Sequence, residues 1–362
     1  MNHLKVEYLS DENEDEWNKF VDNHPESTFY HTLKWKDLLE KSFDFEAKYM
    51  LIRTQEGELV GICPFFITKN LRFFRIINSI PKSDCGGPLI LDEHTNNVSD
   101  TIIENLKNMD GLVYAQVRFS DNNISKYFQQ DNSSVDTRHG TMVLDLKEKP
   151  VDFIWNKIFT NKKGQRKFIR RFDGENFQIT ESQNKEDIEK FYGLYYNNIN
   201  YIGGSPYPLK FFENVWALLY PEHFNILFAE NHEKCIGSLA FFINKKKSTI
   251  YLTYLGLDRD VSNTYHTSYY LYWESIKWAQ NQGVRYVNFG STPSDIASEY
   301  YSIKTDFGAT FNQNYILIIP FNKKLFLLRE NLLNSWAKTK NKLPKSLAKK
   351  FGNNVYRILH KI

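Results

Sequence analysis

The chain has 362 residues, 25% charged and 41% hydrophobic, a composition typical of a folded globular protein and not of a disordered or fibrous one. This length favours two domains and excludes a single small one. The net charge of +3 is unevenly placed: residues 323–362 hold eleven Lys or Arg and one acid, so they carry +10 and residues 1–322 carry −7.

The first half of the chain predicts two helices followed by an antiparallel meander. Residues 11–23 form an acidic amphipathic segment, and residues 32–41 have apolar side chains at helical spacing. Three β-rich runs follow, separated by turn signals at residues 55–57 and 69–70. We expect strands at residues 47–52, 59–69, 73–80 and 111–119, and a short helix at residues 99–108.

The second half repeats this plan. The run LVGICPFFI (59–67) aligns with CIGSLAFFI (235–243), and each has glycine in third place and ends in Phe-Phe-Ile. Strands are expected at residues 225–230, 249–257 and 284–290, with a long helix at 265–281. Because matching elements are offset by a nearly constant 173 to 176 residues, the sequence predicts a duplicated α/β (α+β) domain with mixed, largely antiparallel sheets.

Basic residues concentrate between the two copies and at the C-terminus. Residues 151–172 contain seven Lys or Arg and no acid after Phe153, and we expect one helix there. Residues 325–343 have a helical pattern, and Pro344 begins a further turn. We therefore expect domains at 1–150 and 151–322, followed by a basic helical tail at 323–362.

The three cysteines, Cys63, Cys85 and Cys235, are widely spaced and odd in number, which favours a reducing cytoplasm. No pair of His or Cys has metal-ligand spacing, so no metal is expected. The acidic N-terminus does not resemble a secretory signal, and no apolar run approaches the ~18 residues of a membrane span. The sequence predicts a cytoplasmic protein, at most peripheral to the inner face of a membrane.

Five motifs follow one another along the chain. They are STFYHTLKWKDLLE (27–40), GGPL (86–89), KGQRKFIRR (163–171), SYYLYWESIKWAQNQGVRYVNFGS (268–291) and YYSIKTDFGA (300–309). In order and spacing they resemble the Fem-type branch of the GNAT superfamily, up to about residue 322. The resemblance implies tandem GNAT-like domains and an enzyme that transfers an aminoacyl or acyl group to an amine of a cell-envelope precursor. In the peptidyltransferases of this branch the donor is aminoacyl-tRNA.

The resemblance supplies candidate catalytic residues. Lys304 matches the lysine of the family's Phe-Lys pair, although Ile303 replaces the phenylalanine. Near the transferred acyl group, its ammonium would stabilise an oxyanion or hold the donor. Asp306 and Glu299 are candidate bases for the incoming amine, with solvated loop acids as the alternative interpretation.

Other candidates concern substrate binding. The family usually has Asp where this chain has Asn288, which cannot act as a base, and we predict that Asn288 and Ser291 contact substrate. His31 and Trp35, four residues apart, are predicted to line an acceptor cleft, while a core role explains Trp35 equally well. Tyr201 lies in a segment whose family equivalents contribute to the cleft.

Two basic segments suggest a polyanionic partner. Arg166, Lys167 and Arg170 are predicted to bind phosphates of tRNA or of a nucleotide- or lipid-linked precursor, and a solvated helix face is the alternative. The tail suits an anionic membrane surface, where contact would be peripheral, or tRNA, or a helix that packs on the protein itself.

The donor stays open between aminoacyl-tRNA and acyl-coenzyme A, and no bound cofactor is expected. The turn that would hold a coenzyme A pyrophosphate, LGLDRDVSNTYH (255–266), has one early glycine and two acids, which is a poor phosphate-binding composition. The alternatives to aminoacyl transfer are an acyl-coenzyme A-dependent N-acyltransferase acting on an amino sugar, and a non-catalytic binding protein on the same fold.

Overall fold

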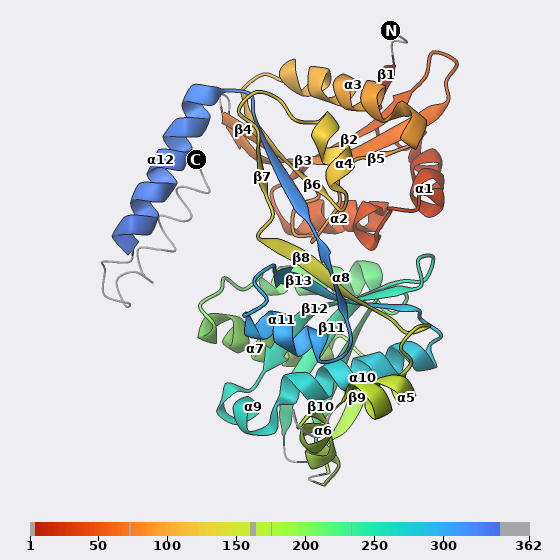
Figure 1. Ribbon diagram of the computed structural model, residues 1–362, viewed down its shortest axis with the longest axis vertical. Helices are drawn as coiled ribbons and strands as arrows, with labels where there is room; N and C mark the ends of the chain where they lie inside the picture. The colour runs from red at the N-terminus through yellow and green to blue at the C-terminus, as the bar shows by residue number, and fades with distance from the viewer. Residues whose placement is uncertain (1–3, 72–73, 160–163, 175, 233, 341–362) are drawn as a thin grey trace. The chain divides into compact units, whose positions relative to one another are not determined.

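The computed structural model describes residues 4–71, 74–159, 164–174, 176–232 and 234–340. The chain forms two compact units (Figure 1), each assembled from separate stretches of sequence. Unit 1 lies within residues 1–27, 44–136 and 315–362, and unit 2 within residues 28–43 and 137–314. The packing therefore departs from the sequential division expected at residue 150.

The described part of unit 1 forms an eight-stranded sheet in the order β1-β2-β3-β4-β6-β15-β7, with β5 paired to β3. Neighbouring strands are antiparallel except for β4 and β6, which are parallel. The strands are β1 (Lys5–Tyr8), β2 (Glu46–Arg53), β3 (Leu59–Leu71), β4 (Phe74–Ser79), β5 (Leu89–Ile90), β6 (Leu112–Phe119), β7 (Ser134–Asp136) and β15 (Tyr315–Pro320). The helices are α1 (Glu14–Asn23), η2 (Asp92–His94), α3 (Thr95–Lys107), α4 (Asn122–Tyr127) and α12 (Lys323–Lys340).

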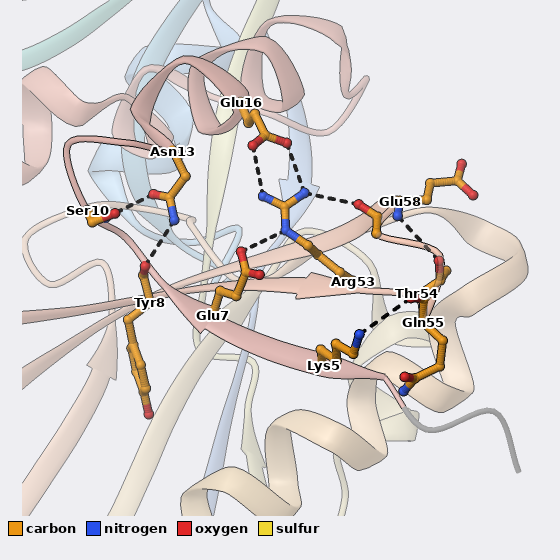
Figure 2. A network of polar contacts seen from close by, with 11 residues as sticks. Lys5, Glu7, Tyr8, Ser10, Asn13, Glu16, Arg53, Thr54, Gln55 and Glu58 are labelled. Carbon is orange, nitrogen blue, oxygen red and sulfur yellow. Dashed lines mark hydrogen bonds and ion pairs between the residues drawn. The ribbon is translucent and has the colours of Figure 1, made fainter.

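A buried arginine joins three elements of unit 1. Arg53 on β2 donates through Nε to Glu7 of β1 and through both Nη groups to the carboxylate of Glu16 on α1, at 2.8 to 3.0 Å (Figure 2). Its Nη1 also donates to the carbonyl oxygen of Gly57. Hydrogen bonding from Arg53 holds the pKa of Glu16 below its usual range. The network fixes α1 and β1 at one edge of the sheet.

Unit 2 repeats the topology of unit 1. Within its described residues a seven-stranded sheet has the order β9-β10-β11-β12-β13-β8-β14, and again only the fourth and fifth strands, β12 and β13, are parallel. The strands are β8 (His139–Asp145), β9 (Gln178–Glu181), β10 (Phe224–Glu230), β11 (Cys235–Asn244), β12 (Thr249–Leu257), β13 (Tyr286–Pro293) and β14 (Thr310–Gln313). The predicted duplication and its mixed sheets are confirmed.

The sixth strand of each sheet comes from the other half of the sequence. In unit 1 it is β15, which follows the second repeat, and in unit 2 it is β8, which precedes that repeat. Residues 28–43 likewise pack in unit 2. This exchange explains why contiguous ranges do not reproduce the compact units.

Helices cover both faces of the unit 2 sheet. They are η1 (Phe29–His31), α2 (Leu33–Ser42), α5 (Val151–Phe153), η3 (Ile154–Ile158), α6 (Gln165–Gly174), α7 (Glu186–Tyr201), α8 (Leu209–Leu219), α9 (Arg259–Tyr265), α10 (Thr267–Asn281) and α11 (Glu299–Thr305). A methyl group on Gly256 would approach Leu194 of α7, and one on Gly237 would approach Leu271 of α10. Because Gly256 pairs with Ser238, the neighbour of Gly237, α7 and α10 lie on opposite faces.

Replacing Gly237 with alanine is expected to lower the free energy of unfolding by roughly 1–3 kcal/mol, because overpacking forces a shift in a close-packed core. Its Cβ would lie 2.6 Å from Thr267 Cγ2 and 3.0 Å from Leu271 Cδ1. Gly193→Ala on α7 is the matched control, since its Cβ would have no neighbour within 4 Å. Urea denaturation measures both variants. Equal midpoints for Gly237→Ala and wild type would contradict the close approach of α10.

The basic segment at residues 151–172 departs from its predicted helix, whereas the tail contains the predicted one. Residues 151–172 are not one helix: α5 gives way to the π-helical η3, and α6 begins only at Gln165. The predicted tail helix is present as α12, while the turn expected after Pro344 falls outside the described residues. None of the described helices is both long and apolar enough to cross a membrane.

Candidate functional site

A cavity of about 660 Å³ lies in unit 2 where the two parallel strands part. β12 and β13 pair only through residues 249–251 and 286–288. Leu255 and Leu257, beyond the last paired residue of β12, line the cavity together with residues of α9, α10 and α11. Its polar lining includes Arg259, His266, Tyr269, Tyr272, Glu299 and Lys304.

Lys304 is buried at the end of α11, with 6% of its surface exposed, and lines the cavity. Its Nζ donates to the carbonyl oxygens of Gly290 and Ser291 at 3.3 and 2.9 Å, and to Thr292 Oγ1 at 2.8 Å. An ammonium has three protons, and these acceptors match them. Lys304 therefore fastens α11 to the end of β13 and places a positive charge beside the cavity.

Asn288 shapes the same strand end. Its Oδ1 accepts a hydrogen bond from the N–H of Gly290 at 2.8 Å, and Gly290 has a φ of 71°. The pairing of β13 with β8 shifts register between Asn288 and Ser291. An amide oxygen can accept this bond as a carboxylate would. Asn288 therefore stabilises the turn in which the carbonyl oxygens of Gly290 and Ser291 accept from Lys304. The side chain of Ser291 is exposed.

The two candidate bases have different surroundings. Asp306 is buried and accepts a hydrogen bond from the hydroxyl of Tyr269 at 2.7 Å, so it orients a phenol that lines the cavity. Burial and this carboxylate raise the pKa of Tyr269 far above its usual value. Glu299 is exposed and lines the cavity itself.

His266 stands between α9 and α10 in the left-handed region, at a φ of 53°. Its ring stacks on Phe168 of α6, with 3.7 Å between ring centres, and it lines the cavity. Burial and, to a lesser degree, the charge of Arg171 lower the pKa of His266. The imidazole is therefore neutral at pH 7 and can accept a proton.

Tyr272 adds a second phenol to the lining. Burial raises the pKa of Tyr272 to about 12, so its hydroxyl stays protonated at neutral pH. Its ring packs against Phe289 and Phe307. Within the described residues no protein group receives its hydrogen bond, which leaves this hydroxyl free to donate to a ligand.

Other predicted binding residues lie elsewhere in unit 2. His31 and Trp35 are buried: His31 Nδ1 accepts from the backbone N–H of Thr28, and Trp35 packs against Tyr30 and Phe242. Neither is among the residues that line the cavity.

The basic residues of α6 do not line the cavity either. Arg166 donates through Nε and Nη2 to the carbonyl oxygen of Trp155, and Arg170 lies over the ring of that tryptophan. Lys167 is exposed, whereas Lys162 and Lys163 fall outside the described residues. Tyr201 is 65% exposed and contacts Arg259, which does line the cavity.

Four lining residues are not among the predicted site residues: His266, Tyr269, Tyr272 and Arg259. Three of them, at positions 266, 269 and 272, are spaced three residues apart and so lie on roughly one face of a helix. The same spacing is also typical of a helix face that packs in the core. Their role depends on the parting of β12 and β13, which no local pattern indicates. Among the described residues no group of His, Cys, Asp or Glu could hold a metal ion.

Comparison with known proteins concerns the fold. Residues 160–301 match the family model of the acetyltransferase (GNAT) domain. The crystal structure of FemX has a TM-score of 0.67 at 13% identity and covers 90% of this chain and 99% of its own. The structure of L-PGS from Bacillus licheniformis has a TM-score of 0.55 at 12% identity and covers 87% of this chain and 94% of its own. A tandem GNAT protein from the clavulanic acid biosynthesis pathway has a TM-score of 0.57 at 8% identity and covers 88% of this chain and 98% of its own.

No curated protein matches the chain in sequence. The chain shares its fold with FemX and with a tandem GNAT protein, and the resemblance to the Fem-type branch is confirmed at the level of the fold.

Proposed function

We propose that this chain is an acyltransferase that forms an amide bond, moving an aminoacyl group onto an amine of a cell-envelope precursor in the cavity of unit 2. The observation that carries the proposal is the meeting of a neutral imidazole, a free phenol and a buried ammonium at one cavity, on a FemX-like fold. Amide formation needs a base, a donor to the oxyanion and positive charge nearby, and these groups supply them.

In the proposed reaction the acceptor amine attacks the carbonyl carbon of the donor ester. The C–N bond forms and the ester C–O bond breaks, and the proton lost by the amine passes through His266 to the departing hydroxyl oxygen. The hydroxyl of Tyr272 donates to the oxyanion of the tetrahedral intermediate, and the charge of Lys304 lowers its energy. No net proton is gained or lost.

We further propose that the donor is an ester carried by tRNA and not a coenzyme A thioester. After β12, Asp258 Oδ1 accepts the N–H of Asp260 at 3.0 Å, so a carboxylate already occupies the start of α9. A pyrophosphate held by the backbone N–H groups of that turn, as in a coenzyme A site, would lose this donor and meet the carboxylate of Asp258 as a like charge. The motifs resemble the Fem-type branch, whose peptidyltransferases use aminoacyl-tRNA, and this supports the same donor.

Acetyl-coenzyme A is therefore expected to leave the melting temperature unchanged at millimolar concentration, whereas a ligand at a hundred times its Kd adds about 2.7 kcal/mol of stability. A thermal-shift titration checks this, with a mixture of charged tRNA at two salt concentrations as the second arm. A saturable rise of several degrees with acetyl-coenzyme A would instead favour the acyl-coenzyme A-dependent enzyme.

The proposed partners are tRNA and a nucleotide- or lipid-linked precursor, in the cytoplasm or at the inner face of its membrane. Lys167 and Arg170 are exposed on α6 and would meet a polyanion there. On α12, Leu327 and Leu328 are 48% and 55% exposed beside basic residues, which supports peripheral contact with an anionic lipid surface.

A further inference from the structure

One guanidinium at the cavity, that of Arg259, has N–H donors that make no hydrogen bond within the described residues. Arg259 lines the cavity at the start of α9. Its Nε donates to Asn198 Oδ1 at 2.7 Å. Within the described part of the chain, its two Nη groups have no hydrogen-bond partner, and no carboxylate lies within ion-pair distance of them.

Two neighbours hold this guanidinium in place. Asn198 on α7 is 3% exposed, and its Nδ2 donates to the carbonyl oxygen of Leu255 at 2.7 Å. That bond fixes which end of the amide faces Arg259. On another side, the guanidinium carbon lies 5.1 Å from the centre of the Tyr201 ring. The conformation of Arg259 is thus set before any ligand arrives, which reduces the entropy cost of binding.

Within the described residues, neither of the two acids next to Arg259 in sequence forms an ion pair with it. Asp258 accepts the N–H of Asp260 at the start of α9, and the side chain of Asp260 is exposed. The other cation of the lining, the ammonium of Lys304, donates to acceptors at the end of β13. Arg259 is consequently the lining cation that retains a pair of adjacent N–H donors for a ligand.

We propose that Arg259 recognises an anionic group of the substrate, taking a phosphate or a carboxylate through its two Nη groups in a bidentate contact. A planar guanidinium with one edge free matches either oxyanion, and lysine cannot reproduce that fork. The inference rests on the proposed function, because it takes the cavity of unit 2 as the substrate site. It narrows the substrate to one that carries a negative group next to the reacting centre.

Anion binding by the purified full chain tests this, with Arg259→Gln and Arg259→Lys against Arg285→Gln as the matched control. Arg285 is exposed and pairs with Asp145 outside the cavity lining. Calorimetric titrations use inorganic phosphate for the phosphate source and N-acetyl-alanine for the carboxylate source. Circular dichroism melts check that each variant folds.

We expect wild type to bind at least one of these probes saturably, and Arg259→Gln to weaken that binding roughly 10- to 100-fold. Arg259→Lys should fall between the two, and Arg285→Gln should match wild type. The probe that binds shows whether the anionic group of the substrate is a phosphate or a carboxylate. Equal affinity in wild type and Arg259→Gln, or no saturable binding of either probe, would overturn the assignment of Arg259. Acyl transfer that persists in wild type would then leave the proposed function intact.

Discussion

Replacing Lys304 with alanine is expected to lower the free energy of unfolding by about 3 kcal/mol and to remove most acyl transfer. The change removes the ammonium from which two carbonyl oxygens and the hydroxyl of Thr292 accept hydrogen bonds, while Thr292 Oγ1 still donates to the carbonyl oxygen of Gly290 at 3.3 Å. Each buried polar group left unsatisfied costs about 1–3 kcal/mol, and relaxation recovers part of the sum. The end of β13, which the ammonium fastens to α11, would no longer be fixed beside the cavity.

Urea denaturation and transfer rates measure the two effects separately. Lys304→Met keeps most of the side-chain volume but not the charge, so it should lose activity as alanine does while leaving a smaller void. Lys245→Ala is the control, because Lys245 is exposed in unit 2 and its replacement should stay within about 0.5 kcal/mol. An unchanged unfolding midpoint in Lys304→Ala would show that the strand end does not depend on this ammonium.

Changing His266 to asparagine is expected to lower kcat at pH 7 by about 10²- to 10⁴-fold, the usual contribution of a general base. Asparagine tolerates the left-handed backbone that His266 adopts at a φ of 53°, so the turn before α10 should persist. His232→Asn is the control, because His232 is exposed and is not among the cavity-lining residues. A His266→Asn enzyme as fast as wild type would remove the imidazole from the reaction.

The dependence of the transfer rate on pH is a second test of the role of His266. Burial lowers the pKa of His266 in the folded chain, so the wild-type rate should fall only below about pH 6.5, the ordinary imidazole value. His266→Asn should lose that acid limb. The stability effect has the matching sign: His266 has no effect above about pH 6.5, and it costs stability as the pH falls from there towards the lowered pKa.

Local patterns predicted the repeated cores well. The Phe-Phe-Ile endings of residues 65–67 and 241–243 are buried in both units, and each third-place glycine lies against a helix, with Gly61 close to Val98 and Gly237 close to Thr267. The exchange of β15 and β8 left no such signal, because strand periodicity does not say which sheet a strand will join. The long helix begins at Thr267 and not at residue 265, since His266 takes a left-handed conformation that its sequence does not announce.

The candidate site was predicted only where a motif supplied it. Lys304 was identified by its resemblance to a family lysine, and it does line the cavity. His266 was not among the predicted site residues, because a histidine at a helix start more often has a structural role. Arg259 became visible only once Asn198, sixty-one residues away in sequence, was found to hold its Nε. His31 and Trp35 have the spacing of one helix face, but His31 belongs to η1 and Trp35 to α2, and both side chains are buried in unit 2.

The measurement that tests the account most directly is single-turnover transfer of a radiolabelled aminoacyl group. Charged tRNA is mixed with nucleotide- and lipid-linked envelope precursors and with either wild-type enzyme or His266→Asn. We predict that label moves into an amide of a precursor with wild type and stays on the tRNA with His266→Asn. Label that stays on the tRNA with wild type, while an acetyl group passes from acetyl-coenzyme A to the same precursors, would contradict the account.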